Sequence, residues 1–156
     1  DLVRAMPNNP CTIGEGMTVL TTAEGTPTSR LEEVERIFAS VGRTLSLPEN
    51  LFDAVTGLSA SGPAYVYLFI EALADGGVKV GIPKEVAIVL ATQTVLGAAR
   101  MVLETGEHPA KLKDLVATPG GTTVCGLFEL EQGGLRASSM RAVERATARA
   151  RELSSQ

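Results

Sequence analysis

The sequence has few of the residues from which disulfide frameworks, metal sites and histidine-based catalytic centres are built. Its 156 residues include two cysteines, Cys11 and Cys125, and one histidine, His108. Two thiols so far apart predict neither a disulfide framework nor a metal-ligand cluster, so we expect no metal. Because no evident base lies beside Cys125 in the sequence, we interpret it as a small packed cysteine in a reduced, cytoplasmic protein.

Long apolar runs and an excess of positive charge are absent too. No uninterrupted run reaches the ~18–20 apolar residues of a membrane span, because Thr92-Gln93-Thr94 interrupts the longest one. No charged segment followed by an apolar one opens the chain, so we expect neither a secretory signal nor a membrane partner. The formal net charge of −4 and the sequence pI of about 5.1 argue against a nucleic-acid partner.

Complete nucleotide-binding fingerprints are missing as well. A dinucleotide-binding fold has G-x-G-x-x-G after its first strand, and Gly14-Glu15-Gly16 lacks the third glycine. The outer glycines of Gly57–Gly62 have the spacing of a P-loop, but Pro63 stands where that loop requires lysine. The sequence therefore disfavours ATP binding.

Residues 1–48 have a mixed α/β pattern. Their β-branched residues predict strands over 15–22 and 43–47. Between these strands, Ser29 and Glu32 have the spacing of a capping box, and apolar residues follow at helical intervals. Strand, helix, strand is the unit of a parallel sheet, but two strands are too few to form a sheet alone. We therefore expect this region to be the edge of a larger sheet.

The rest of the chain has a helical pattern. Prolines and glycines delimit predicted helices over 63–75, 83–104 and 135–153, with short helices after Pro109 and Gly121. The first two of these helices are apolar on nearly every face, and such a helix must be buried on every side. A domain of about a hundred residues can hardly cover both, so we expect a second copy to cover them. A compact monomeric bundle is the alternative.

The segment Ala117–Val124 is the strongest candidate for a binding site. It is a proline-glycine-glycine turn that runs into a helical pattern. Gly120 and Gly121 have no Cβ, so a ligand can approach the backbone closely. Thr122 and Thr123 fall where the first helical amides have no intrahelical partner, and such amides bind anions. An ordinary threonine-capped helix start is the alternative.

Seven segments of the chain, in order and spacing, resemble the pyrroline-5-carboxylate reductases. They are Arg4–Asn8, Asp53–Tyr65, Glu71–Lys79, Gln93–Ala99, His108–Asp114, Ala117–Val124 and Leu130–Arg136. These enzymes make proline from a cyclic imine with a nicotinamide cofactor. The resemblance covers essentially the whole chain, and it implies that an N-terminal half with the nucleotide fingerprint precedes Asp1 in the complete enzyme.

The resemblance implies a mainly α fold with two domains. Residues 1–48 would be the C-terminal edge of a Rossmann-type α/β domain, and residues 49–156 an all-helical domain for dimerisation and substrate binding. The helical domains of two copies would interlock in a homodimer, from which a larger ring can assemble. NADPH or NADH would be bound mainly by the absent N-terminal half.

The resemblance also implies the residues of the site. The substrate-binding residues would be Glu49, Thr118, Gly120, Gly121, Thr122 and Thr123, and Ser61 would contact the cofactor. The substrate carboxylate would lie on the amides of Gly121, Thr122 and Thr123. Thr123 would be catalytic, because a hydroxyl bonded to the imine nitrogen makes the neighbouring carbon more electrophilic.

Read without the family, the same residues have simpler roles. Glu49 is a first-turn carboxylate, Ser59 or Ser61 is an N-cap, and His108 shapes the helix start at Pro109. Two other functions also remain open. A related two-domain reductase for another imine or a keto acid would share the carboxylate-binding turn. A catalytically silent helical oligomerisation module would explain the apolar helices but leave the turn with no purpose beyond capping.

Overall fold

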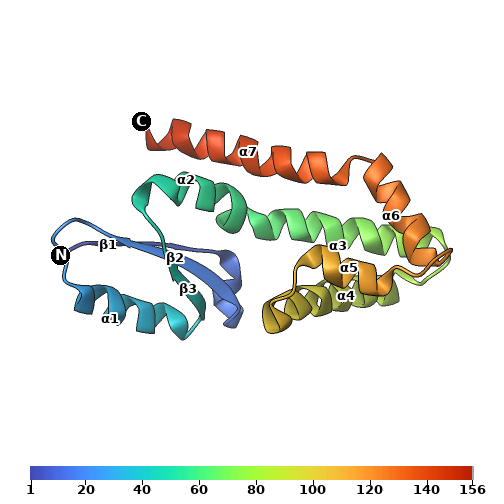
Figure 1. Cartoon of the computed structure of the whole chain (residues 1–156), viewed down its shortest axis with the longest axis horizontal. Helices are drawn as coiled ribbons and strands as arrows, with labels where there is room; N and C mark the ends of the chain where they lie inside the picture. The colour runs from blue at the N-terminus through green and yellow to red at the C-terminus, as the bar shows by residue number, and fades with distance from the viewer. Residues whose placement is uncertain (156) are drawn as a thin grey trace. The chain divides into compact units, whose positions relative to one another are not determined.

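The computed structural model describes residues 1–155 and divides the chain into two compact units. One unit comprises Asp1–Tyr65 together with the residues from Ser139 onward, and the other comprises Val66–Ser138. Two helices, α3 (Gly62–Lys79) and α7 (Leu135–Ser154), have residues in both units. Figure 1 labels the elements in chain order.

The first unit is built on a three-stranded mixed sheet. Strand β1 (Val3–Pro7) pairs antiparallel with β2 (Gly16–Thr22), and β2 pairs parallel with β3 (Gly42–Ser46). Helix α1 (Thr28–Ala39) joins β2 to β3 and packs against the sheet, beneath it in Figure 1. The predicted strand-helix-strand unit is thus confirmed, and both parallel strands lie within one residue of their predicted bounds.

One strand of this unit was not predicted, and one local prediction for it is wrong. Strand β1 has no predicted counterpart, because a short segment ending in Met6-Pro7 has little strand propensity and becomes a strand by pairing with β2. The capping box of Ser29 and Glu32 does not begin α1 either. The N-cap is Pro27, two residues before Ser29; its backbone is extended (φ −60°, ψ 141°), and no side chain caps the helix.

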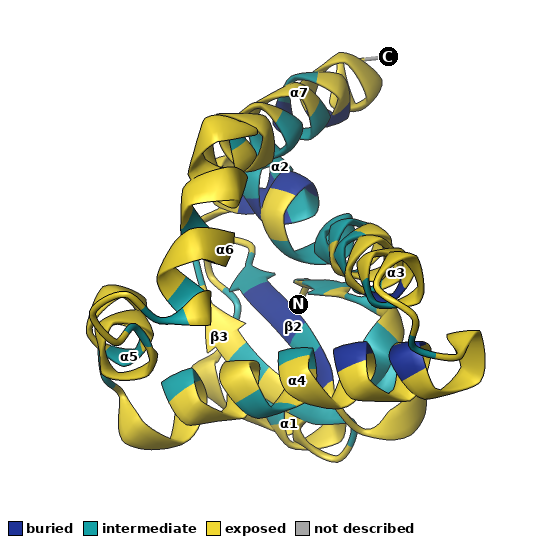
Figure 2. Cartoon of the chain, turned by 90° about the vertical axis from the view of Figure 1, so that its right-hand side faces the viewer, coloured by how far each residue is buried: buried dark blue, intermediate teal, exposed yellow. Residues whose placement is uncertain are grey.

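The core of the first unit lies on both faces of β2, which is the dark blue strand in Figure 2. On one face, Val19 packs with Phe52 and Val55, the two ends of α2 (Phe52–Val55). Thr18 and Leu20 alternate with Val19 and so point to the opposite face, where both are buried. Helix α2 is thereby held on the sheet by apolar contacts at both of its ends.

A π-helical turn, Thr56–Ala60, follows α2 and packs against α7. Gly57 is buried at this contact. A Cβ at Gly57 would lie 2.8 Å from the Val143 carbonyl oxygen and 2.9 Å from the Thr147 backbone nitrogen. Because these are backbone atoms of α7, no side-chain rotation can make room for a methyl group, and α7 itself would have to shift.

Gly57→Ala is therefore expected to destabilise the chain by about 1–3 kcal/mol, the usual cost of overpacking. Gly76→Ala in α3 is the matched control, because nothing lies within 4 Å of a Cβ there. Helix propensity alone predicts that this control stabilises by up to ~1 kcal/mol. Urea unfolding followed by circular dichroism measures both variants. If the free energy of unfolding changed in the same direction in both variants, the close packing of Gly57 on α7 would be contradicted.

The second unit contains only helices among its described residues. Helices α4 (Lys84–Thr105), α5 (Pro109–Val116) and α6 (Thr122–Gln132) follow α3 and match the predicted helices. Its small core consists of Ala74 from α3 and Ala87 and Ala91 from α4. Figure 2 shows most of α4, α5 and α6 as exposed.

Helix α3 runs through Gly76 and Gly77, where the sequence predicts its end. The helix instead ends at Lys79. Gly81 (φ 101°) follows, and the Ile82 N–H donates to the Gly77 oxygen at 3.0 Å, as in a Schellman motif. Gly77 has a packing role inside the helix, because a Cβ there would lie 3.3 Å from the Ala87 Cβ. Its missing side chain lets α3 and α4 lie close together.

Most large apolar side chains of α3 and α4 are exposed. They are Val66, Tyr67, Leu68, Leu73, Val78, Val86, Ile88, Val89, Leu90, Leu96, Met101 and Leu103. We expected the polar triplet Thr92–Thr94 to exclude a membrane span here, but this expectation is wrong for the length and composition of α4. Within residues 1–155, α4 is long and apolar enough to cross a membrane, and 11% of its most apolar 18-residue window is buried. These apolar faces are thus left without a cover inside the chain.

Candidate functional site

The segment Thr118–Gly121 forms a tight turn. The Gly121 N–H donates to the Thr118 carbonyl oxygen at 3.0 Å, Pro119 occupies the second position, and Gly120 occupies the third with φ 68°. These features are typical of a type II turn, whose third position requires a positive φ that glycine adopts without strain. The proline-glycine pair therefore dictates how the chain enters α6.

Helix α6 begins directly after this turn. Gly121 is its N-cap residue (φ −78°, ψ 164°), and no side chain caps the helix. The threonine-capped start that the sequence left open is therefore not what the structure contains. The N–H groups of Thr122 and Thr123 have neither an intrahelical partner nor a side-chain cap, so they are available to an anion. The Gly121 N–H is occupied within the turn, which removes it from the three amides expected to hold a carboxylate.

Thr122 and Thr123, the first two residues of α6, differ in exposure. Thr122 is exposed, whereas Thr123 is half-buried. Within residues 1–155, neither hydroxyl takes part in a side-chain hydrogen bond. Thr123 is thus a half-buried residue with an unbonded hydroxyl, next to amides that can bind an anion. Thr118, by contrast, is exposed, and its carbonyl accepts the hydrogen bond that closes the turn.

Glu49 lies in the first unit, in a 3₁₀ turn (Glu49–Leu51) that precedes α2. One of its carboxylate oxygens accepts a hydrogen bond from Arg4 Nη1 of β1, and the two side chains form an ion pair. The Arg4 guanidinium also lies over the Phe52 ring, 4.7 Å from the ring centroid. The Glu49 carboxylate, which was predicted to contact substrate, therefore forms an ion pair that joins β1 to the turn before α2.

Ser61 ends the π-helical turn and directly precedes α3. Its backbone is helical (φ −83°, ψ −22°), whereas an N-cap residue has an extended backbone. The N-cap role expected for Ser59 or Ser61 is therefore wrong, because the chain stays helical from α2 through the π-helical turn into α3. Ser61 is half-buried, and within residues 1–155 its hydroxyl makes no side-chain hydrogen bond. That hydroxyl is available to a ligand.

His108 and Cys125 are the two residues for which the sequence invited a chemical role. His108 Nδ1 accepts the Ala110 N–H at 3.2 Å and so caps α5, which confirms its role at the helix start. Cys125 is exposed, so its interpretation as a packed cysteine is wrong for this chain. In the part of the chain that the structure describes, no group of three His, Cys, Asp or Glu residues could hold a metal ion.

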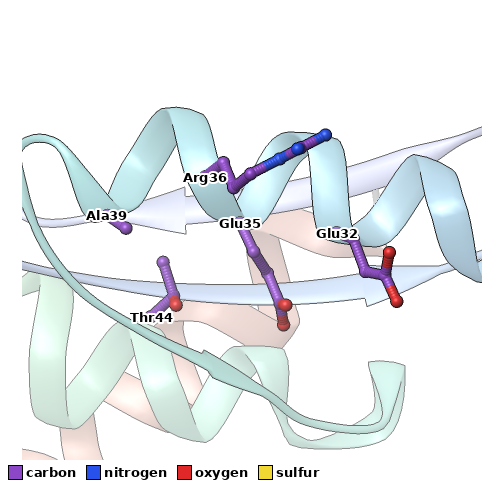
Figure 3. Close-up of a pocket in the computed structure, with 5 residues that line it drawn as sticks. All are labelled: Glu32, Glu35, Arg36, Ala39 and Thr44. Carbon is purple, nitrogen blue, oxygen red and sulfur yellow. The ribbon is translucent and has the colours of Figure 1, made fainter.

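An open hollow of about 310 Å³ lies between α1 and β3, and none of its lining residues is a predicted site residue. Its lining residues are Glu32, Glu35, Arg36, Ala39 and Thr44 (Figure 3). Glu35 accepts a hydrogen bond from the Ser46 hydroxyl at 3.0 Å, and Arg36 points away from Glu35 in this view. The hollow therefore has one carboxylate tied to the neighbouring strand and no convergent charges.

The predicted site residues fall into two sets, one in each unit. Glu49 and Ser61 belong to the first unit, and the turn residues Thr118–Thr123 belong to the second. Of the two sets, the second alone combines uncapped amides with a half-buried threonine. It is therefore the better suited of the two to bind a small anionic ligand.

A protein-family model, described as pyrroline-5-carboxylate reductase dimerisation, matches residues 49–153. A pyrroline-5-carboxylate reductase of Arabidopsis thaliana is 54% identical over 152 residues, which are 97% of this chain and 55% of the relative. One of Synechocystis is 51% identical over 97% of this chain and 57% of the relative. The chain thus spans little more than half the length of these curated relatives.

Solved structures show the same fold. A pyrroline-5-carboxylate reductase from Coxiella burnetii matches with a TM-score of 0.93 at 41% identity, covering 97% of this chain and 56% of that chain. A Plasmodium falciparum pyrroline carboxylate reductase with NADP bound matches with a TM-score of 0.89 at 38% identity. That match covers 96% of this chain and 62% of that chain.

Proposed function

The chain belongs to the pyrroline-5-carboxylate reductase family, and from this premise we propose that it supplies the substrate-binding and dimerisation half of such an enzyme. The whole enzyme reduces the cyclic imine pyrroline-5-carboxylate to L-proline, the last step of proline biosynthesis. Residues 1–48 form the edge of its nucleotide-binding domain, and residues 49–156 its helical domain. It acts in the cytoplasm, without nucleic acid, membrane or metal as partner.

The observation that carries this proposal is the turn Thr118–Gly121 with the uncapped start of α6. The substrate carboxylate lies on the free amides of Thr122 and Thr123, where the positive end of the helix dipole stabilises negative charge. Gly120 and Gly121 keep the approach to those amides free of side chains. Thr118, which closes the turn, borders the same substrate position.

Thr123 acts on the imine nitrogen. The residue is half-buried, and its hydroxyl has no side-chain hydrogen bond within residues 1–155. The hydroxyl therefore hydrogen-bonds the nitrogen and makes the neighbouring carbon more electrophilic. Threonine is a weak acid, and for this reason the hydroxyl orients or relays a proton that comes from solvent. Orientation of the substrate supplies most of the remaining acceleration.

The nicotinamide cofactor, NADPH or NADH, supplies the hydride when it is bound. The described residues fit only one side of such a cofactor, because they lack the dinucleotide fingerprint and offer the free Ser61 hydroxyl. Ser61 therefore contacts the nicotinamide side, and an N-terminal half that contains the fingerprint binds the rest. Glu49, paired with Arg4, borders the substrate from the start of the helical domain.

A second copy of the chain covers the exposed apolar helices. On α4, Val89, Leu96 and Leu103 recur every seven residues, on the face opposite the buried Ala87 and Ala91. An open hollow of about 250 Å³ on α4, lined by Ile88, Val89, Thr92 and Gln93, can receive side chains of the partner. Covering this surface in a homodimer, rather than in a membrane, agrees with the family's dimerisation domain. Dimers can assemble further into a ring.

Turnover by a hybrid enzyme tests this function. In the hybrid enzyme, this chain follows the N-terminal half of the Synechocystis relative, to which it is 51% identical over the matched region. We expect formation of proline from pyrroline-5-carboxylate and NADPH, and no reduction of open-chain 2-keto acids. Keto-acid reduction would favour a related reductase. A folded dimeric hybrid without any turnover would favour a silent oligomerisation module.

Gly121→Val is expected to raise the KM for pyrroline-5-carboxylate about 10-fold or more, the equivalent of about 1.4 kcal/mol of binding. A Cβ at Gly121 would overlap the Thr118 hydroxyl and lie 3.1 Å from the Thr118 carbonyl oxygen, so the Thr118 side chain would have to rotate and its carbonyl to shift slightly. The branched valine side chain would also crowd the approach to the first amides of α6. Gly126→Val, in α6 with nothing within 4 Å of its Cβ, is the matched control. Steady-state kinetics of the hybrid enzyme measures both, and an unchanged KM in Gly121→Val would place the carboxylate elsewhere.

A further inference from the structure

The helical run from α2 to α3 loses its regular hydrogen bonding at the π-helical turn. The Ser61 N–H donates to the Thr56 carbonyl oxygen, five residues back, at 3.0 Å. In a regular α-helix this N–H would bond to Gly57, so the Gly57 carbonyl loses its normal donor. The Tyr65 hydroxyl replaces it and donates to the Gly57 oxygen at 3.2 Å.

Pro63 removes a second donor from the same turn. The carbonyl of Ser59 would accept from residue 63 in a regular helix, but proline has no N–H. The side-chain amide of Asn8 takes that place, with Nδ2 lying 3.3 Å from the Ser59 oxygen. Two carbonyls that lose their helical donors at this turn, those of Gly57 and Ser59, are therefore bonded by side chains, and the side chain on Ser59 comes from the loop after β1.

The orientation of the Asn8 amide is dictated by its other contacts. Asn8 Oδ1 accepts the Met17 N–H at 2.9 Å, and the Asn8 N–H donates to the Met17 oxygen at 3.2 Å. Because a backbone N–H can only donate, the amide oxygen must face Met17 and the amide nitrogen must face Ser59. Asn8 is thus locked to the start of β2 and reaches the π-helical turn from a fixed point.

We propose that Asn8 is a positioning residue for the cofactor-binding turn. By bonding Ser59, it holds the π-helical turn in the geometry that places the Ser61 hydroxyl against the nicotinamide side of the cofactor. Tyr65 supports the same turn through Gly57. This inference rests on the proposed function, in which Ser61 contacts the cofactor.

Asn8→Asp in the hybrid enzyme tests the inference. The aspartate keeps an oxygen for the Met17 N–H, but its second oxygen faces the Ser59 carbonyl without a hydrogen between them, so the contact with the turn becomes repulsive. We expect the KM for NADPH to rise about 10-fold, as for one part-buried carbonyl left without its donor, while the KM for the imine changes less than about twofold. Asn9→Asp adds the same charge at an exposed neighbour and is the matched control.

Tyr65→Phe provides a second variant that removes only the hydroxyl bonded to Gly57, and it is expected to raise the KM for NADPH in the same selective way. In this chain alone, amide hydrogen exchange of Ser61 is expected to quicken in both variants. An unchanged KM for NADPH in an active enzyme, or an equal rise of both KM values, would overturn the inference.

The two proposals fail in distinguishable ways. If the unsubstituted hybrid enzyme makes no proline, the proposed function is overturned, and with it the link from Asn8 to the cofactor. If the hybrid enzyme is active but Asn8→Asp behaves like Asn9→Asp, the proposed function stands and only the inference about Asn8 is overturned. The inference about Asn8 would also be overturned if the Ser61 amide exchanged no faster in Asn8→Asp than in the unsubstituted chain.

Discussion

Thr123→Ala is expected to lower the kcat of the hybrid enzyme at least about 10-fold, near the low end of the effect of losing positioned proton donation. The substitution removes the half-buried hydroxyl at the start of α6 and leaves the backbone amides in place. The carboxylate should therefore still bind, so the KM for the imine should change much less than kcat. Steady-state reduction of pyrroline-5-carboxylate with saturating NADPH measures both quantities.

Two further variants test whether the effect is specific to the Thr123 hydroxyl. Thr123→Ser keeps a hydroxyl at the same position and should recover most of the activity. Thr122→Ala removes the neighbouring exposed hydroxyl and should affect KM more than kcat, because in the proposed mechanism Thr122 belongs to the carboxylate site and not to the imine nitrogen. If Thr123→Ala formed proline as fast as the unsubstituted hybrid enzyme, the proposed substrate would be supported, but the proposed role of Thr123 would be contradicted.

The second large effect is expected at the apolar face of α4. The double variant Val89→Asp with Leu96→Asp should convert a dimer of this chain into monomers. The two side chains are 65% and 47% exposed in the single chain and lie one heptad apart on one face of the helix. In a dimer their replacements would be buried carboxylates without partners, each costing several kcal/mol. Light scattering coupled to size exclusion measures the molar mass.

Ile13→Asp is the matched control for this experiment. Ile13 is 77% exposed and lies in the 3₁₀ helix after β1, outside the proposed dimerisation domain. It should leave the molar mass unchanged. A monomeric unsubstituted chain would contradict the proposed dimer. Partition of the unsubstituted chain into lipid vesicles would instead favour the reading of α4 as a membrane segment, which its length and composition permit.

Local patterns were sufficient to predict α4, α5, α6 and α7 and the turn before α6. The starts of these four helices and the ends of α4 and α6 lie at proline or glycine positions, because proline lacks an N–H and glycine adopts a positive φ. The Pro119-Gly120 pair likewise predicts a turn. Both kinds of signal act within a few residues, so no knowledge of the tertiary structure is needed to read them.

Contacts between distant segments were not predictable from the same patterns. Strand β1 exists through its pairing with β2, and Gly77 stays inside α3 because α4 packs against it. Arg4 and Asn8 begin and end the first of the segments that resemble the family. Their partners Glu49 and Ser59 lie 45 and 51 residues further along the chain. Nothing in a linear pattern relates residues so far apart.

The sequence by itself determined the family, the boundaries of most of the later helices and the position of the turn before α6, because these depend on local backbone preferences and on long matching motifs. Only the tertiary structure decided which polar groups in that framework are already occupied. It shows that the Gly121 amide closes the turn, that Glu49 is paired with Arg4, and that Asn8 replaces the donor missing at Pro63. Hydrogen bonds are satisfied by whatever group the fold brings within about 3 Å, and that proximity is a property of packing rather than of sequence order.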